Sequence, residues 1–267
     1  MSKKTAKKTT KSTAKKSTGK ATKTAKKAVE EVIRENSLVY IDYVARIKGD
    51  GKIFDLTLED VAKQEGLYKE NDRYEPMLVA VGWNWLLASL EEEIIGMKVG
   101  ESRTVEIPPE KGAGLRDQSK VKMIPKTKMA KHGERYPVKG AQVTVGREQG
   151  VITAVLGRTV RVDFNSPLAG KTLVFEVTLR EIVSTPEEKL LAVIKRRIPG
   201  LPKDNYKASV KGKTVTIELP KETRYIENIQ YAEIGIAADA LKVIEKANEV
   251  KLTVTFERPE TPKENTT

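Results

Sequence analysis

The sequence predicts an α+β protein, in which half-buried strands and one short helix are followed by a second α+β unit. Three observations support this prediction. Apolar and polar residues alternate at 38–46 and again at 173–179, which is typical of half-buried strands. Residues 85–95 repeat leucine and isoleucine at helical spacing before Gly96, which predicts a short amphipathic helix. A capping box at Thr185 then opens a further series of helical and strand patterns.

The composition excludes several kinds of site. The 267 residues include no cysteine and a single histidine, His132, which we expect in a surface loop. Disulfides, thiolate or histidine metal sites and Ser-His or Cys-His catalysis are therefore not expected, and we predict no metal and no cofactor. No apolar run approaches the roughly 20 residues of a membrane-spanning helix. The basic N-terminus has no apolar segment behind it, so we expect a cytoplasmic protein.

The positive charge is concentrated at the N-terminus. Residues 1–27 hold eleven lysines and no acid, whereas the net charge of the whole chain is +12, which leaves +1 for the remainder. We expect residues 1–34 to be a disordered tail, because they have too few apolar side chains to form a core. The tail is either a solubilising arm or an arm that binds RNA or DNA phosphates without sequence preference. The second reading would use lysine pairs such as Lys7, Lys8, Lys15, Lys16, Lys26 and Lys27.

The first strand pattern, at 38–46, is followed by a Gly-Asp-Gly turn at 49–51 and a short apolar stretch at 52–55. Residues 57–76 are polar and favour a helix, then a turn. Residues 78–81 are apolar and lead into the window 82–89, which holds both tryptophans of the chain, Trp83 and Trp85. They are either exposed edge residues or part of an apolar rim for unfolded polypeptides.

Five stretches resemble a known family, and the opening strands at 39–55 and the helix at 85–95 are two of them. Residues 162–179, VDFNSPLAGKTLVFEVTL, are similar to the closing segment of SlyD-like, FKBP-type peptidyl-prolyl isomerases. Residues 94–111, with IGMKVGE and TVEIPPEK, resemble the turn and strand that precede the flap in that family. Residues 57–76, TLEDVAKQEGLYKENDRYEP, resemble a loop of the long archaeal members. The resemblance implies an FKBP-like antiparallel sheet wrapped on one short helix, and an isomerase and chaperone acting on unfolded or proline-containing polypeptides.

The resemblance also implies a substrate cleft. By position in the family, its catalytic walls would be Tyr43, Phe54, Asp55, Leu86, Leu87 and Phe175, and its further substrate contacts would be Met77, Trp85, Leu90 and Ala113. Taken singly, Tyr43 and Phe54 could equally be ordinary core aromatics, and Asp55 could cap a turn.

The flap departs from the family's pattern. Where the family has Ala-Tyr-Gly, this chain has Gly112-Ala113-Gly114, so the tyrosine hydroxyl that would bond a substrate carbonyl is missing. We expect a weakened isomerase with a looser flap loop. The alternative is an FKBP scaffold that has lost useful catalysis and acts as a chaperone or binding module, tethered to ribosomes or nucleic acid by the tail.

The expected organisation has five parts. The isomerase domain comprises 35–114 and 166–184, and the flap insertion comprises 115–165, with short strands at 143–145, 151–155 and 160–164. The resemblance makes this insertion a chaperone domain, while the alternative is a passive insertion. A C-terminal α+β domain at 185–258 would hold a first helix after Thr185, a hairpin at 206–219, a helix at 232–247 and a strand at 250–256, before a frayed end at 259–267. The sequence does not indicate what this domain binds.

Overall fold

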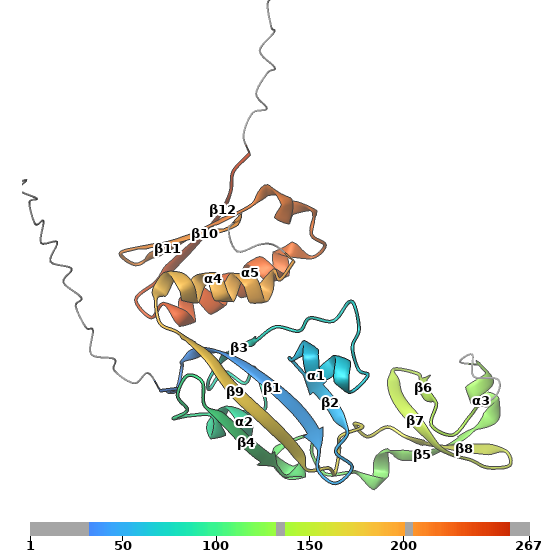
Figure 1. Cartoon of the computed structure of the whole chain (residues 1–267). Helices are drawn as coiled ribbons and strands as arrows, with labels where there is room; N and C mark the ends of the chain where they lie inside the picture. The colour runs from blue at the N-terminus through green and yellow to red at the C-terminus, as the bar shows by residue number, and fades with distance from the viewer. Residues whose placement is uncertain (1–31, 132–136, 201–204, 257–267) are drawn as a thin grey trace, which may run out of the picture. The chain divides into compact units, whose positions relative to one another are not determined.

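The computed structural model describes residues 32–131, 137–200 and 205–256 (Figure 1). The tail lysines and His132 lie outside this part of the chain. The helices are α1 (Glu59–Gln64), α2 (Ala88–Glu93), α3 (Lys126–Lys131), α4 (Pro186–Arg197) and α5 (Ile229–Val243). The strands are β1 (Leu38–Ile47), β2 (Ile53–Leu56), β3 (Met77–Ala80), β4 (Ser102–Ile107), β5 (Val121–Pro125), β6 (Gln142–Val145), β7 (Glu148–Val155), β8 (Thr159–Asp163), β9 (Leu173–Val183), β10 (Lys207–Lys211), β11 (Thr214–Leu219) and β12 (Glu249–Val254). Among the described helices, none is long and apolar enough to cross a membrane.

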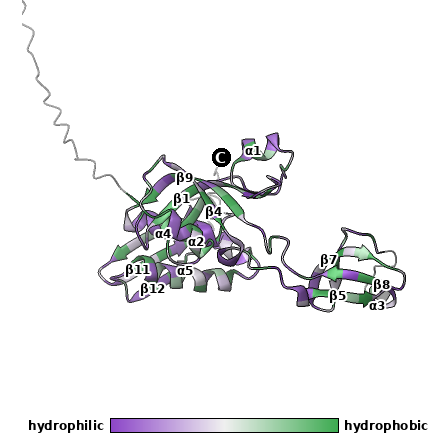
Figure 2. Cartoon of the chain, turned by 90° about the horizontal axis from the view of Figure 1, so that it is seen from below, coloured by the Kyte–Doolittle hydropathy of each residue, from purple (hydrophilic) through white to green (hydrophobic). Residues whose placement is uncertain are grey.

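A five-stranded antiparallel sheet is built around β1 and β9, which lie side by side in Figure 1. One edge of β1 pairs with β3 through Leu38–Ile41 and with β2 through Val44–Arg46, while β9 pairs with β1 on one side and β4 on the other. Along β9, Leu173, Phe175, Val177 and Leu179 are buried, as the alternation predicts. These strands carry both hydrophobic and hydrophilic residues in Figure 2, and their buried side chains meet α2 in the main core.

The central strand β1 is buried on both faces. Val39, Ile41 and Tyr43 belong to the main core with α2, whereas Leu38 belongs to a second cluster with Ala192 and Val193 of α4. The half-buried strand expected from the alternation is therefore buried further, because a C-terminal helix covers the face that the pattern assigns to solvent.

The folded part begins earlier than the sequence indicates. Val32 forms an isolated bridge with Lys98, and the Ile33 N–H donates to the Met97 carbonyl at 3.0 Å. The Ile33 side chain is buried in the main core. The folded part thus includes residues that the sequence assigns to the tail ending at residue 34, and one of them, Ile33, belongs to the core.

Helix α2 begins at Ala88, three residues after the start expected at Trp85. Leu87, at its N-cap, has an extended backbone with φ −62° and ψ 128°. The apolar pattern starts before the helix because Leu86 and Leu87 pack against the core from the turn-rich loop at 81–87.

Residues 121–163 form a separate four-stranded antiparallel sheet in the order β5-β8-β7-β6. The expected strands are β6, β7 and β8, and the β7–β8 hairpin turns at 156–158. β5 and α3 are additional elements. β5 shows no alternation because only Ile124 of its five residues is buried, and α3 adds Met129 to the small core.

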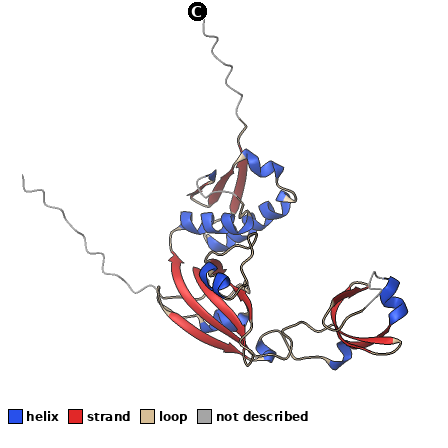
Figure 3. Cartoon of the chain, turned by 45° about the vertical axis from the view of Figure 1, so that its right-hand side comes forward, coloured by secondary structure: helices blue, strands red, loops and turns tan. Residues whose placement is uncertain are grey.

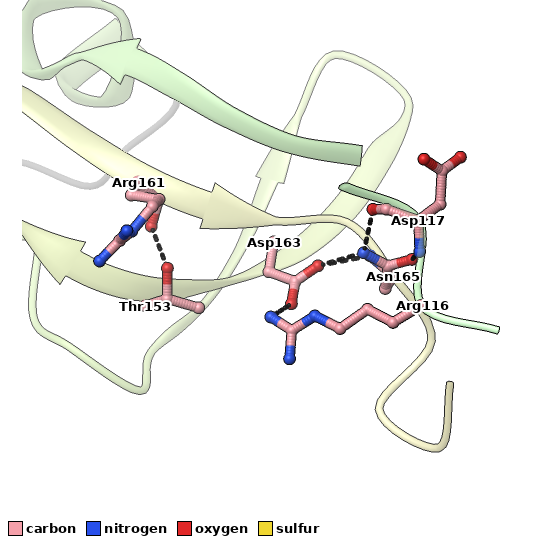
Figure 4. A network of polar contacts seen from close by, with 6 residues as sticks. All are labelled: Arg116, Asp117, Thr153, Arg161, Asp163 and Asn165. Atoms are coloured by element: carbon pink, nitrogen blue, oxygen red, sulfur yellow. Dashed lines mark hydrogen bonds and ion pairs between the residues drawn. The ribbon is translucent and has the colours of Figure 1, made fainter. Parts of the chain in front are cut away.

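The two connections to this inserted sheet are joined by polar contacts (Figure 4). The Arg116 guanidinium pairs with the Asp163 carboxylate. The Asn165 side chain accepts from the Asp117 N–H at 2.9 Å and donates to the Asp117 carbonyl at 2.8 Å. The Gly170 N–H donates to the Gly114 carbonyl at 2.8 Å. Asp163 and Asn165 therefore hold the connection that follows β8 against the connection that precedes β5.

Residues 186–254 form a three-stranded sheet packed with α4 and α5, which hold most of the helical residues (Figure 3). The Thr185 hydroxyl accepts from the Glu188 N–H at 3.3 Å, as in the predicted capping box. β11 pairs antiparallel with β10 and parallel with β12. α5 ends at Val243, before the end expected at 247, because Ile244 and Ala247 continue the apolar pattern from a buried turn after the helix.

Candidate functional site

An apolar cleft of about 210 Å³ opens on the main core. We call it the apolar cleft. Strands β1, β2 and β9, helix α2 and three loops supply its walls. Its lining residues are Tyr43, Phe54, Asp55, Leu86, Leu87, Leu90, Ala113, Leu168, Leu173 and Phe175. Apart from the phenol of Tyr43 and the carboxylate of Asp55, these side chains are hydrocarbon, so the cleft suits an apolar ring or side chain.

Three aromatic rings from three strands form one wall. The Phe175 ring of β9 lies between the Tyr43 ring of β1, with centroids 6.1 Å apart, and the Phe54 ring of β2, with centroids 5.9 Å apart. The Phe54 and Phe175 rings meet edge to face at 86°. This arrangement is favourable for aromatic pairs and fixes the orientation of each ring.

The polar contact in the cleft joins Tyr43 and Asp55. The Tyr43 hydroxyl donates to Asp55 Oδ2 at 2.7 Å. Burial of the phenol, together with the hydrogen bond and the negative charge of Asp55, raises the pKa of Tyr43 well above its usual range. The phenol is therefore neutral at physiological pH, and Asp55 holds its hydrogen in a fixed direction.

A buried polar network supports Tyr43 from behind. The Tyr43 N–H donates to Thr57 Oγ1 at 2.9 Å, and the Thr57 hydroxyl donates to Asp42 Oδ1 at 2.8 Å. The other oxygen of Asp42 accepts from Arg180 Nε on β9. Asp42 and Thr57 are both buried, and each has a partner, so this network fixes β2 against β1 at the cleft.

Glu91 of α2 holds the loop that presents Leu86 and Leu87. Its carboxylate is only 2% exposed and accepts three backbone N–H groups, from Gly82 at 2.8 Å, Asn84 at 3.1 Å and Leu86 at 2.8 Å. Because a carboxylate accepts hydrogen bonds at both oxygens, this one side chain fixes the N–H groups of every second residue from Gly82 to Leu86. Glu91 is thus a positioning residue for the leucines of the cleft.

The flap loop at Ala113 is fixed more firmly than its glycines suggest. The Gly114 N–H donates to the Pro109 carbonyl at 2.8 Å, and the Ser89 hydroxyl donates to the Lys111 carbonyl at 3.1 Å. Gly114 has φ +82°, a left-handed conformation that favours glycine. Gly114 therefore fits a hydrogen-bonded turn, and the expected loosening of this loop stays a prediction.

The structure brings together eight of the ten residues that the family resemblance places at the site. The other two, Met77 and Trp85, line a neighbouring groove of about 680 Å³, which we call the α4 groove because α4 supplies one wall. Leu168, Leu173 and Glu91 were not predicted. Leu168 is the one large apolar residue in the 165–170 turn, and Leu173 shares a strand face with Phe175, so the sequence pattern could have indicated both. Nothing in the sequence distinguishes Glu91 from a surface acid of a helix.

Comparison with known proteins gives a consistent result. A family model described as FKBP-type peptidyl-prolyl cis-trans isomerase matches residues 30–180, and a second, described as FKBP26 C-terminal, matches residues 186–257. A short-type peptidyl-prolyl cis-trans isomerase of Methanocaldococcus jannaschii is 38% identical over 157 residues, which cover 59% of this chain and 98% of that protein. The FKBP-type 16 kDa isomerase of Escherichia coli is 28% identical, covering 57% of this chain and 95% of that protein. A SlyD isomerase of Aeromonas hydrophila is 30% identical over 43% of this chain and 55% of that protein.

Proposed function

The chain belongs to the FKBP-type peptidyl-prolyl cis-trans isomerase family, and on that premise we propose that its apolar cleft accelerates rotation about Xaa-Pro bonds in polypeptides. One observation carries the proposal: Tyr43, Phe54 and Phe175 meet Leu86 and Leu87 around a single cavity of about 210 Å³. A proline ring is apolar and compact, and this cavity offers it hydrocarbon walls on several sides.

The chemistry needs no metal, acid or base. The planar amide is protected by a barrier of about 18–20 kcal/mol, and uncatalysed exchange takes tens to hundreds of seconds. An apolar environment disfavours the charge-separated planar amide relative to the twisted one, which lowers the barrier. The aromatic wall and the leucine loop supply that environment, while the Tyr43–Asp55 pair is the polar group nearest to the bound segment.

We further propose that catalysis is attenuated at Ala113. This residue lines the apolar cleft at the position where the family's tyrosine donates a hydroxyl to a substrate carbonyl. Alanine cannot donate, and the loss of one neutral hydrogen bond costs about 0.5–1.5 kcal/mol, which is roughly twofold to tenfold in rate.

The cis-to-trans rate of a short Xaa-Pro peptide tests both statements. We expect the native chain to accelerate exchange, Ala113→Tyr to accelerate it further, and Ala113→Phe, which adds the ring without the hydroxyl, to give no comparable gain. An equal gain in the two variants would contradict the hydrogen-bond argument. No acceleration in the native chain, with activity restored in Ala113→Tyr, would favour the alternative of a binding module.

A second candidate function is chaperone activity toward unfolded polypeptides, and exposed apolar side chains of the inserted sheet and its connection favour it. Leu115, Met123, Val138, Val155 and Leu156 are all exposed. Exposed apolar side chains on a small sheet and its connections offer contacts to unfolded segments that have apolar residues of their own.

Suppression of aggregation of a reduced or heat-unfolded protein tests this function. We expect the double substitution Val138→Ser and Leu156→Ser to weaken suppression without changing the rate of peptide isomerisation. Val99→Ser, which changes an equally exposed valine outside the insertion, serves as control. Equal suppression by native chain and double variant would remove the insertion from this role.

We also propose that the lysine-rich N-terminus is a tether to RNA or DNA. The cytoplasmic location expected from the sequence stays a prediction. The eleven lysines without an acid support phosphate binding. If about six phosphates are engaged, the logarithm of affinity should fall with the logarithm of salt concentration at a slope near −5. Unchanged affinity after replacing six lysines by glutamine would refute the tether; the positions are Lys7, Lys8, Lys15, Lys16, Lys26 and Lys27.

A further inference from the structure

The α4 groove adjoins the apolar cleft. Both are lined by Tyr43 and Asp55, so this pair borders the two cavities. The α4 groove, at about 680 Å³, is roughly three times the volume of the apolar cleft. A polypeptide with its proline in the apolar cleft therefore has an adjoining channel for the residues next to the proline.

One wall of this groove comes from the end of α4. The described residues from Val32 onward belong to one compact unit, in which Ala192 and Val193 of α4 pack with Leu38 and Leu78 of the five-stranded sheet. The Arg196 guanidinium carbon lies 3.7 Å from the centre of the Trp85 ring, which is within cation–π range. These contacts place Arg196, at the end of α4, beside the loop before α2 that holds Leu86 and Leu87.

The charges along the groove are unbalanced. Four cations line it: Arg73, Lys195, Arg196 and Arg197. Lys195 pairs with Glu75, and Arg197 pairs with Asp239 of α5 at 2.7 Å. Within the described part of the chain, Arg73 and Arg196 have no acidic partner within 4.0 Å. Asp55 is already engaged by the Tyr43 hydroxyl.

The surroundings of Arg196 favour an anion beside it. Burial lowers the pKa of Arg196 and the neighbouring cation of Arg197 lowers it further, and the opposing charge of Asp239 only partly offsets these two effects. A carboxylate in the groove would offset both effects, since it supplies a charge of opposite sign and hydrogen-bond acceptors for the guanidinium. Aromatic and apolar groups such as Trp85 and Met77 line the same groove and would contact the rest of the bound segment.

We propose that the α4 groove is a subsite that selects prolyl substrates with an acidic side chain within a few residues of the proline. Arg73 and Arg196 would bind the carboxylate of that side chain. The C-terminal domain thereby contributes directly to substrate choice through α4. The inference rests on the proposed isomerase function and specifies its substrate class.

Isomerisation of matched peptides tests the proposal. Each peptide carries one Glu, Gln or Lys two to four residues before or after the proline. At low salt we expect kcat/KM for the best Glu peptide to exceed that of the matching Lys peptide by about twofold to fivefold for each arginine engaged. The preference should shrink in high salt, because screening weakens partly exposed charge pairs.

Two sets of variants locate the effect. Arg73→Gln with Arg196→Gln should bring the Glu/Lys ratio toward one, whereas Arg196→Lys, which keeps the charge, should retain a preference. Lys211→Gln with Lys213→Gln makes the same change in net charge on the exposed β10–β11 hairpin and should leave the ratio unchanged. Thermal unfolding of each variant identifies any that fail to fold, and Arg73→Gln alone then carries the comparison. A ratio of one in the native chain, or a ratio that survives the double Arg variant, overturns the proposal.

Peptide binding separates this inference from the proposed function. The change in tryptophan fluorescence reports occupancy near Trp85 whether or not exchange is accelerated. If no peptide is isomerised, tighter binding of the Glu peptide than of the Lys peptide still supports the charged subsite, while equal dissociation constants refute it.

Discussion

Replacing Glu91 by glutamine tests whether one carboxylate positions the leucines of the apolar cleft. The carboxylate accepts from the N–H groups of Gly82, Asn84 and Leu86 at 2.8–3.1 Å. Whichever way the glutamine amide is turned, one end is an NH₂ group that faces a backbone N–H, so at least one hydrogen bond is lost. A bond to a charged acceptor contributes about 1.5–3 kcal/mol, and we expect the loop to be destabilised by about that amount.

Tryptophan fluorescence during urea unfolding measures this effect, because the only two tryptophans, Trp83 and Trp85, lie in the affected loop. We expect Glu91→Gln to shift the transition to lower urea and to reduce kcat/KM for a prolyl peptide, since Leu86 and Leu87 lose their support. Glu92→Gln removes the same charge from an exposed neighbour and is the control. Unfolding and kinetics that match this control would refute the positioning role of Glu91.

Three further predictions concern the aromatic wall, the base of the insertion and the phenol. Phe175→Ala should cost about 3–5 kcal/mol in thermal or urea unfolding, because a buried ring between two others is removed; a cost no larger than that of Val174→Ala on the opposite face would contradict it. Burial raises the pKa of Asp163, but hydrogen bonds from Asn165 and the charge of Arg116 outweigh it, so the pKa is lowered. The Asp163 carboxylate therefore contributes to the free energy of unfolding at pH values above its ordinary pKa of about 3.9, and this contribution is lost as the pH falls through the lower pKa of the folded state. The protection of the Asn165 amide, measured from its exchange rate relative to the intrinsic rate at the same pH, should therefore fall below about pH 4, and Asp163→Asn should show no such step; identical profiles would argue against this. The pKa of Tyr43 is raised, so its contribution is complete below about pH 10 and decreases as pH rises above that value; Tyr43→Phe should lack this part of the alkaline loss of stability in unfolding between pH 8 and 12, and equal losses would count against the raised pKa.

Much of the main sheet could be predicted, because strand alternation and burial agree where a strand has one solvent face. Leu173 to Leu179 of β9 is the clearest case. The same reasoning underestimated the burial of β1, since no local pattern shows that α4, almost 150 residues later, covers its second face. The first strand of the inserted sheet was missed for the opposite reason, because Ile124 alone is buried on it.

The apolar cleft was predictable from family wording, but not from periodicity. Leu86 and Leu87 fit a helical repeat and yet lie in the loop before α2. The Glu91 carboxylate holds this loop, and the sequence does not distinguish Glu91 from Glu92 and Glu93. Trp85 was expected in the cleft, and it faces the α4 groove with Arg196 over its ring. Such placements depend on a partner distant in sequence, and a pattern read along the chain cannot supply that partner.

The hydrogen bond between Gly170 and Gly114 has a consequence for how this protein can vary. Because the chain leaves and re-enters the main fold at adjacent points, the strands on either side can form in the same register whatever length of chain lies between them. The junction is therefore a natural site for grafting. A short turn or a foreign binding loop that replaces the chain between Arg116 and Asp163 should leave the main sheet intact and keep Leu168 in the apolar cleft.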